Sequence, residues 1–154
     1  METARHRTFD VLGNLIKFHA FPDETDGKYC LMEAVVPKGM GAPPNMHPGE
    51  METFYMLEGE VAFHVDGEDF MATAGDCLVV PDGGVHAFSG VAERSRLLII
   101  NAPGNVHEAF FTDIGVALPE GSTEPAPPSG PPDVPALVAK GAALGMTILV
   151  PENA

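Results

Sequence analysis

Closely spaced turn signals between residues 28 and 100 constrain the fold of this chain most strongly. Short apolar runs alternate there with turn-forming clusters such as Glu58-Gly59, Asp66-Gly67 and Ala74-Gly75-Asp76. Short strands separated by such turns are typical of antiparallel sandwiches and barrels. A parallel sheet would need crossover helices, and the intervals between these runs are too short to hold them. We therefore predict an all-β domain of about eight short strands.

The apolar runs give the expected positions of these strands, each of which is followed within three residues by Gly, Pro or Asp. They are 15–20, 29–36, 52–57, 61–65, 70–73, 77–80, 85–88 and 96–100. Residues 1–10 are expected to be a loose lead-in, and the Ala-Pro-Pro run at 42–44 to be stiff and extended.

The character of the sequence changes after Pro103. Asn105 is followed three residues later by Glu108, which predicts a capped short helix over 106–114. A Pro-, Gly- and Ser-rich linker follows, then a second short helix over 134–144 and an extended tail. We expect residues 1–117 to form the β-barrel domain with one packed helix, and residues 118–154 to supply the linker, the second helix and the tail that pack on it.

The charge of the chain excludes some classes of partner. The formal net charge is -14, so nucleic acid and anionic membrane surfaces would be repelled. We expect neither a signal peptide nor a membrane span, and a cytoplasmic location. The two cysteines, Cys30 and Cys77, lack the spacing of a metal or redox motif, and we expect both to be buried small side chains.

Two stretches of the chain carry polar residues suited to a metal. In the stretch 41–59, Asn45 and His47 are two residues apart and so share one face of an extended strand, and Glu52 follows a Pro-Gly break. The stretch 75–90 carries His86. Two imidazoles and one carboxylate presented from rigid strands suit Fe(II) and neighbouring first-row metals. The alternative for His47, Glu52 and His86 is a hydrogen-bonded polar cluster that lines the barrel.

Asn45 leaves two possibilities open. Its amide oxygen is a weak, hard ligand that could complete the metal shell, and its withdrawal would leave a position for water or substrate. The site is then either an open catalytic metal centre or a weakened, partly empty one. Among the other histidines, His64 is expected on the surface or on a dimer face, and no role is assigned to His6, His19 or His107.

The spacing of these residues resembles that of the two sequence motifs of the cupin family. The matching elements are Gly41-x5-His47, Glu52-x6-Gly59 and Gly75-x5-Pro81-x-Gly83-x2-His86. The resemblance covers about residues 28–102. Within that family, the lead-in Pro-Pro-x-x-His, the run Glu-Thr-Phe-Tyr-Met-Leu-Glu-Gly-Glu and the Pro-Gly-x-x-x-Glu-x-Phe-Phe stretch after the barrel are similar to single-domain, quercetinase-like cupins.

This resemblance implies a jelly-roll barrel, usually a homodimer, with a divalent transition metal (Fe, Mn, Ni, Zn or Cu) held by His-x-His, Glu and a further His. Carried over by position, the second His of the pair is His47, the carboxylate is Glu52 and the last imidazole is His86. The first His of the pair falls on Asn45, which departs from the family pattern. The terminal Asn of the second motif falls on Gly90, a lesser departure.

The resemblance also implies a reaction, a dioxygenase acting on a small, aromatic or polyketide-like oxygenated molecule. Glu52 would accept the proton of a substrate hydroxyl. Phe54, Met56, Phe63 and Phe88 are the expected pocket walls, suited to a flat apolar ligand. A non-redox isomerase or cyclase, and a non-catalytic small-molecule-binding cupin with a degraded metal site, are the alternatives.

Overall fold

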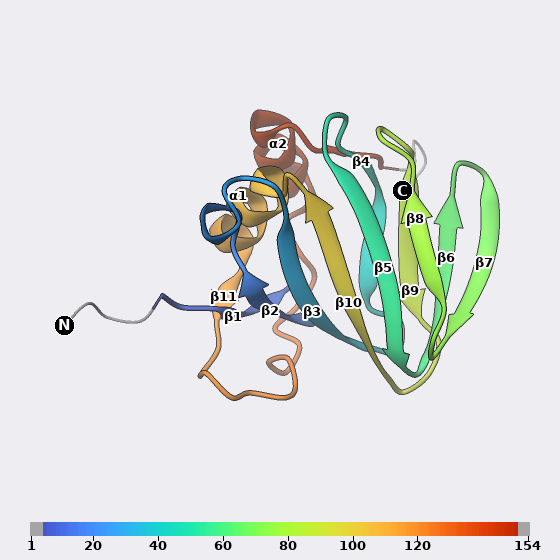
Figure 1. Cartoon of the computed structure of the whole chain (residues 1–154). Helices are drawn as coiled ribbons and strands as arrows, with labels where there is room; N and C mark the ends of the chain where they lie inside the picture. The colour runs from blue at the N-terminus through green and yellow to red at the C-terminus, as the bar shows by residue number, and fades with distance from the viewer. Residues whose placement is uncertain (1–4, 151–154) are drawn as a thin grey trace.

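The computed structural model describes residues 5–150, which fold into two facing antiparallel β-sheets with two short α-helices at one side (Figure 1). The larger sheet has the order β11-β1-β2-β3-β10-β5-β8, and the smaller has the order β12-β4-β9-β6-β7. This confirms the predicted cupin-type all-β fold with short C-terminal helices. No helix among residues 5–150 is both long and apolar enough to cross a membrane.

The strands of the larger sheet are β11 (Val116–Ala117), β1 (Thr8–Val11), β2 (Asn14–Ala20), β3 (Cys30–Pro37), β10 (Arg94–Ala102), β5 (Met51–Glu58) and β8 (Cys77–Val80). The strands of the smaller sheet are β12 (Thr147–Ile148), β4 (Gly41–Met46), β9 (His86–Gly90), β6 (Glu60–Val65) and β7 (Glu68–Thr73). A single 3-10 turn, η1 (Pro22–Glu24), links β2 to β3.

The hydrophobic core lies between the two sheets, because successive side chains of a strand point to opposite faces. In β5, Phe54 and Met56 are buried, whereas Tyr55 between them is exposed. Leu97 and Ile99 of β10 are buried opposite them, in register with β5. The side chains that face inward therefore fix the pairing of these strands, since a slip of one residue would turn them all outward.

Two expectations from the sequence are wrong, one for residues 8–10 and one for Cys77. Residues 8–10, expected to be loose, belong to β1, which pairs with both β2 and β11 and buries Thr8 and Val11. Cys77, expected to be buried, is exposed, whereas Cys30 is buried as expected. The reason is that β8 is the edge strand of its sheet and turns Cys77 and Val79 outward.

The first helix, α1 (Asn105–Ile114), begins differently from the prediction. Its N-cap is Gly104, in the left-handed conformation with φ 97°, and no side chain of that residue can cap the helix. Asn105 is instead the first helical residue. Gly104 is required here, because a Cβ at this position would lie 2.3 Å from the Cβ of Cys30. The close approach presses the start of α1 against β3.

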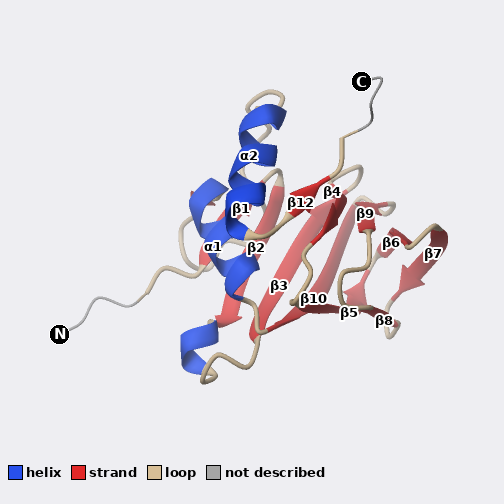
Figure 2. Ribbon diagram, turned by 90° about the horizontal axis from the view of Figure 1, so that it is seen from above, coloured by secondary structure: helices blue, strands red, loops and turns tan. Residues whose placement is uncertain are grey.

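The C-terminal part of the chain returns to the smaller sheet. Helix α2 (Val134–Leu144) has the predicted bounds, and the Asp133 side chain accepts a hydrogen bond of 3.1 Å from the backbone N–H of Ala136. Strand β12 then pairs with β4, so that Ile148 lies opposite Asn45. Seen from above, α1, α2 and β12 lie next to one another beside β4 (Figure 2). The tail therefore reaches the edge of the region that carries the candidate metal ligands.

Candidate metal centre

Four buried side chains from four separate elements meet at the end of the barrel next to α1. His47 follows β4, Glu52 belongs to β5, His86 begins β9 and His107 lies in the first turns of α1. None is more than 4 % exposed. The structure thus brings together the three predicted residues His47, Glu52 and His86, and it adds His107, for which no role was predicted.

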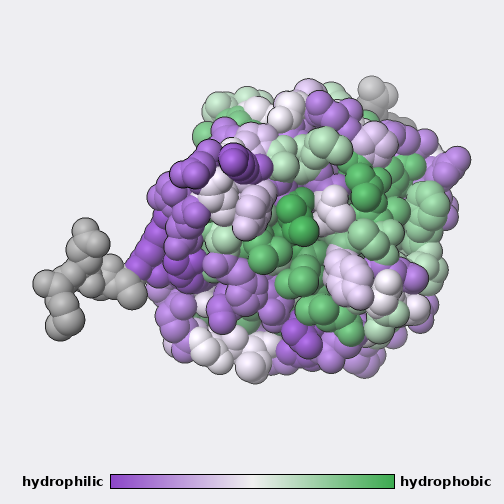
Figure 3. All heavy atoms as spheres, viewed as in Figure 1, coloured by the Kyte–Doolittle hydropathy of each residue, from purple (hydrophilic) through white to green (hydrophobic). Residues whose placement is uncertain are grey.

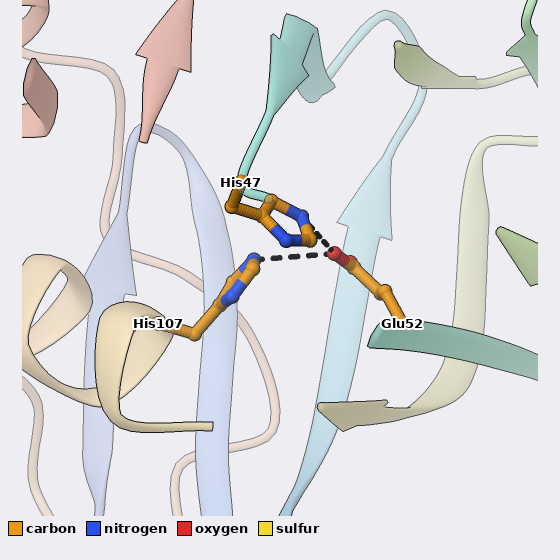
Figure 4. A group of neighbouring side chains, drawn as sticks. All are labelled: His47, Glu52 and His107. Atoms are coloured by element: carbon orange, nitrogen blue, oxygen red, sulfur yellow. Dashed lines mark ion pairs between the residues drawn. The ribbon is translucent and has the colours of Figure 1, made fainter. Parts of the chain in front are cut away.

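The four side chains converge on one atom, Oε2 of Glu52. The Nε2 atoms of His47, His107 and His86 lie 2.8, 3.2 and 3.3 Å from this oxygen. The Nε2 atoms of His47 and His86 are also 3.3 Å apart. Figure 4 shows the rings of His47 and His107 one above the other on the same side of the carboxylate, which points toward both of them. The ligand atoms of His47, Glu52 and His107 therefore form one group, all within 4.8 Å of one another, and His86 borders it through its contacts with Glu52 and His47.

The second nitrogen of each ring is held by an oxygen acceptor. Nδ1 of His47 donates to the backbone carbonyl of Glu50 at 2.8 Å, and Nδ1 of His86 donates to the carbonyl of Gly84 at 2.9 Å. Nδ1 of His107 contacts the Glu50 carboxylate. With the Nδ1 protons committed in this way, each Nε2 is left to face Glu52. Metal-ligating histidines use this arrangement, in which an oxygen acceptor fixes the tautomer of the ring.

The donor set fits a divalent metal. Although three nitrogens lie close to it, Oε2 of Glu52 is buried and has no hydrogen bond of normal geometry within residues 5–150. The ring nitrogens are therefore within ion-pair distance of the oxygen without being aligned on it as hydrogen-bond donors. Ligands around a metal show this pattern, because their lone pairs aim at a shared central point. Three imidazoles and a carboxylate suit first-row transition metals.

The electrostatics of the cluster agree with this geometry. Burial alone would raise the pKa of Glu52, but the nearby imidazoles, His107 foremost, outweigh it and hold this pKa well below its usual range. Burial would lower the pKa of His107, but Glu52 and Glu50 outweigh it and raise this pKa to about 9. The cluster thus favours positive charge around the carboxylate, and a divalent cation can supply that charge in place of protons.

Asn45 lies beside this cluster, in the lining of a cavity, with its amide nitrogen already committed. Nδ2 donates to the carbonyls of Pro43 (2.9 Å) and His86 (3.3 Å), so the side chain ties β4 to β9. Oδ1 is buried, and no hydrogen-bond partner for it is found in residues 5–150. The third imidazole is supplied by His107 of α1, from outside both sequence motifs.

A sequence signal for His107 did exist. Among the residues of α1, His107 and Phe110 are the buried ones, and they are three residues apart. Residues at this spacing share one face of a helix, so the predicted helix itself indicates that His107 faces the barrel. What the sequence could not provide was the direction of the helix axis relative to the two motifs.

A cavity of about 720 Å³ opens over this cluster. Asn45, Glu52, His86 and His107 line its polar end. Of the predicted pocket walls, Phe88 lines the cavity. Phe54, Met56 and Phe63 belong to the buried core instead, because β5 and β6 direct them between the sheets.

The remaining walls of the cavity are mostly apolar and come from both the barrel and the end of the chain. They include Phe110, Val134, Leu137, Met146 and Ile148. The C-terminal helices and tail therefore line the ligand space itself, beyond packing on the barrel.

The other histidines lie away from the site. His64 is exposed, and its Nδ1 lies 2.6 Å from Asp69. His19 lies 3.1 Å from Glu33 on the outer side of β2 and β3, and Glu33 also contacts Arg96. His6 contacts the backbone carbonyl of Thr8. These contacts give none of the three a place in the metal-binding cluster.

Comparison with known proteins also points to the cupin family. The cupin domain family matches residues 31–101. The chain is 32% identical over 114 residues to quercetin 2,3-dioxygenase of Bacillus subtilis, a match that covers 74% of this chain and 33% of that protein. The chain thus spans about a third of the length of that relative.

Two solved structures share the fold. A predicted oxalate decarboxylase from Thermotoga maritima superposes with a TM-score of 0.60 at 21% identity, covering 63% of this chain and 92% of that one. KdgF from Halomonas sp. superposes with a TM-score of 0.57 at 21% identity, covering 64% of this chain and 86% of that one. Together with the two-sheet architecture and the buried His/Glu cluster, the sequence matches show that residues 31–101 form a cupin domain and that the chain is a distant homologue of quercetin 2,3-dioxygenase.

Proposed function

We propose that this cupin is a metal-dependent dioxygenase that acts on a small, aromatic or polyketide-like oxygenated molecule. The observation that carries the proposal is the convergence of His47, Glu52, His86 and His107 at the polar end of an apolar cavity. The distant homology to quercetin 2,3-dioxygenase supports the same class of reaction. Dioxygenation adds both atoms of O₂ to the substrate, so it requires no external reductant.

The residues divide the work between binding the metal and handling the substrate. His47, His86, His107 and Glu52 would hold the metal, which supplies a Lewis acid and a template for oxygen ligands when bound. Glu52 also lines the cavity, so its carboxylate is placed to accept the proton of a substrate hydroxyl. The oxygenated edge of the substrate would face this polar end.

The shape and lining of the cavity support a flat apolar ligand. Its volume of about 720 Å³ lies within the range of small-molecule sites, which are mostly apolar with a few convergent polar groups. Phe88 and Phe111 offer aromatic surface on two sides, and Met40 and Met146 offer adaptable apolar contacts. An aromatic ring with adjacent oxygens matches this division into an apolar body and a polar end.

The test is metal loading followed by oxygen consumption. The full chain would be loaded separately with Fe²⁺, Mn²⁺, Ni²⁺, Zn²⁺ and Cu²⁺, and its metal content measured. O₂ uptake would then be followed with quercetin, a flavonol, as the probe. We expect one metal equivalent per chain and O₂ uptake that is lost in His86→Ala. A chain that takes up none of the five metals would overturn the proposal.

One outcome of the same experiment would favour the alternatives. If metal and quercetin both bind but no O₂ is consumed, a non-redox isomerase or cyclase, or a small-molecule-binding cupin, becomes the better assignment. Asn45→His separates these alternatives further. Gain of activity in that variant would mark the natural site as a degraded one, whereas loss of a measured activity would mark Asn45 as functional.

We further propose that the protein forms a homodimer through the outer face of the larger sheet. Met51 and Tyr55 of β5, Val79 of β8 and Ile100 of β10 are exposed on this face, and their strands are neighbours. Figure 3 shows the hydrophobic patch over these strands. Exposed apolar patches of this kind mark interaction sites, and β8 also leaves a free strand edge.

The oligomeric state tests this second proposal directly. Light scattering on a sizing column should give the mass of a dimer for the natural chain and of a monomer for Val79→Glu. Met71→Glu, which alters an exposed residue of β7 in the other sheet, is the matched control and should remain dimeric. A natural chain that is monomeric at high micromolar concentration would contradict it.

A further inference from the structure

Glu50 is a buried carboxylate that the metal-binding set leaves without a role. It lies in the turn between β4 and β5 and is only 2 % exposed. Burying a charged side chain is costly unless it is paired and hydrogen-bonded. Both oxygens of Glu50 find their partners in α1, which is distant in sequence and starts after the barrel is complete.

The first contact of Glu50 is with the backbone at the start of α1. Oε2 accepts a hydrogen bond of 2.9 Å from the N–H of Val106, and Oε1 accepts a longer one, 3.4 Å, from the N–H of His107. N–H groups in the first turn of a helix have no partner within the helix. The N-cap residue, Gly104, offers no side chain for them. Glu50 therefore caps α1 from another element.

The second contact is with the imidazole rings of the site. The Glu50 carboxylate contacts Nδ1 of His107, and the backbone carbonyl of the same residue accepts from Nδ1 of His47. One residue thus holds two of the three rings by the nitrogen that points away from the cluster. Their Nε2 atoms are in consequence directed at Glu52, at 2.8 and 3.2 Å.

We propose that Glu50 is a positioning residue that fixes the ring and tautomer of His107. It thereby completes the metal site, because β4 carries Asn45 and so does not supply that imidazole. This inference rests on the proposed metal centre. A carboxylate that accepts the outer N–H of a ligating imidazole holds the ring in place and raises its basicity. The same carboxylate anchors the helix, so the position of α1 and the direction of the His107 ring are set together.

A glutamine at position 50 separates these two roles. Its single amide oxygen can still accept from one backbone N–H of α1. Its NH₂ group, however, is a donor and would meet another donor, either a backbone N–H or Nδ1–H of His107. The variant therefore keeps most of the shape of the site and loses the charged acceptor.

The experiment measures metal binding on the full chain. The affinity for Zn²⁺ would be determined by competition with a chelator, and the coordination of Co²⁺ by its visible absorption. For Glu50→Gln we expect an affinity roughly 10- to 100-fold lower than that of the natural chain. We also expect a Co²⁺ spectrum shifted in the same direction as that of His107→Ala. Glu108→Gln is the matched control, because Glu108 lies in the same turn of α1 but pairs with Arg5, and it should bind metal as the natural chain does.

The double variant Glu50→Gln/His107→Ala shows whether Glu50 acts through His107. If it does, the double variant binds Zn²⁺ within about threefold of His107→Ala alone, since residues that share one function are not additive. Multiplied losses in the double variant would contradict the proposal.

The other outcomes separate this inference from the proposed function. A Glu50→Gln chain with natural affinity and spectrum but a lower thermal midpoint would show that Glu50 only anchors the helix, and the proposed function would stand. A natural chain that binds neither metal would overturn both. If Glu50→Gln does not fold, Glu50→Asp keeps the charge at a shorter reach. It should bind Zn²⁺ with an affinity between those of the natural chain and His107→Ala, and an affinity equal to that of the natural chain would contradict the proposal.

Discussion

The barrel, formed by strands β1 to β10, and the C-terminal segment, residues 103–150, contribute to the site in different ways. The barrel presents His47, Glu52 and His86 from paired strands, at positions that the cupin motifs define. The C-terminal segment presents His107 from a helix held by Gly104 at one end and capped by Glu50. It also provides much of the apolar wall of the cavity.

The comparison shows that different interactions fix the two parts of the site. Strand pairing fixes the barrel residues, because a change of register would turn them out of the core. The helix is instead held by the close approach of Gly104 to Cys30 and by the cap from Glu50. We therefore expect the barrel to determine whether a metal binds. The C-terminal segment should determine the last ligand of the metal site and which molecule binds in the cavity.

The largest expected effect is the loss of a barrel ligand. Glu52→Gln removes the one anionic donor at the centre of three imidazoles. Disrupting a buried charge cluster of this kind costs about 3–5 kcal/mol, which corresponds to a loss in affinity of roughly 150- to 5,000-fold. Equilibrium dialysis against Zn²⁺ measures it. His107→Ala should lose less, and equal losses in the two variants would remove the distinction between barrel and helix ligands.

The second prediction exchanges the two sources of the third imidazole. In Asn45→His/His107→Ala, the imidazole returns to β4 and is lost from α1. We expect Zn²⁺ affinity to recover to within about tenfold of the natural chain, whereas Asn45→Ala/His107→Ala should remain as weak as His107→Ala. Failure of the histidine at position 45 to restore any affinity would show that the two positions are not equivalent.

A substitution in the wall of the cavity should leave the metal untouched. Leu137→Ala removes apolar surface that α2 contributes, so the affinity for quercetin should fall by up to about tenfold, as expected for a few lost methylene contacts. Titration calorimetry on the Zn²⁺-loaded chain measures it. Lys140→Ala on the same helix, whose side chain pairs with Asp113 instead, should bind quercetin normally. Equal affinity in both variants would argue that α2 is not part of the ligand site.

The smallest effect reports on the junction between the two regions. Cys30 is fully buried against Gly104, and burial raises the pKa of its thiol to about 12, whereas Cys77 is exposed on β8. A thiol reagent should therefore modify Cys77 at once and Cys30 only when α1 leaves the barrel. In Cys77→Ser, the rate at Cys30 measures that opening. Modification of Cys30 as fast as that of Cys77 would show that the helix is not held.

The sequence predicted the part of the molecule that local rules control. Turn chemistry and alternation located the barrel strands, and the spacing of the motifs brought His47, Glu52 and His86 together. Cys77 was misplaced, because an apolar run does not reveal that its strand is at the edge of a sheet. The cap of α1 was also wrong, since the local pattern of Asn105 and Glu108 does not reveal that the helix starts after Gly104 and is capped by Glu50 from far along the chain.

His107 was missed for a related reason. Its spacing from His86 follows no motif, and its place depends on how a helix packs after the barrel has formed. The absence of a histidine at position 45 was the available clue, because a site short of one imidazole needs another from elsewhere. The buried face that His107 shares with Phe110 on α1 would have indicated where to find it.

The pairing of β12 with β4 has a consequence for the order in which the protein is made. Ile148 lies opposite Asn45, so the last strand of residues 5–150 is added beside one of the first strands of the site. Synthesis runs from the N-terminus, and the barrel ligands therefore emerge well before His107, α2 and β12. The barrel therefore presents His47, Glu52 and His86 before His107 and the C-terminal part of the cavity wall are added. The segments that close the ligand pocket are thus synthesised after the barrel that they close.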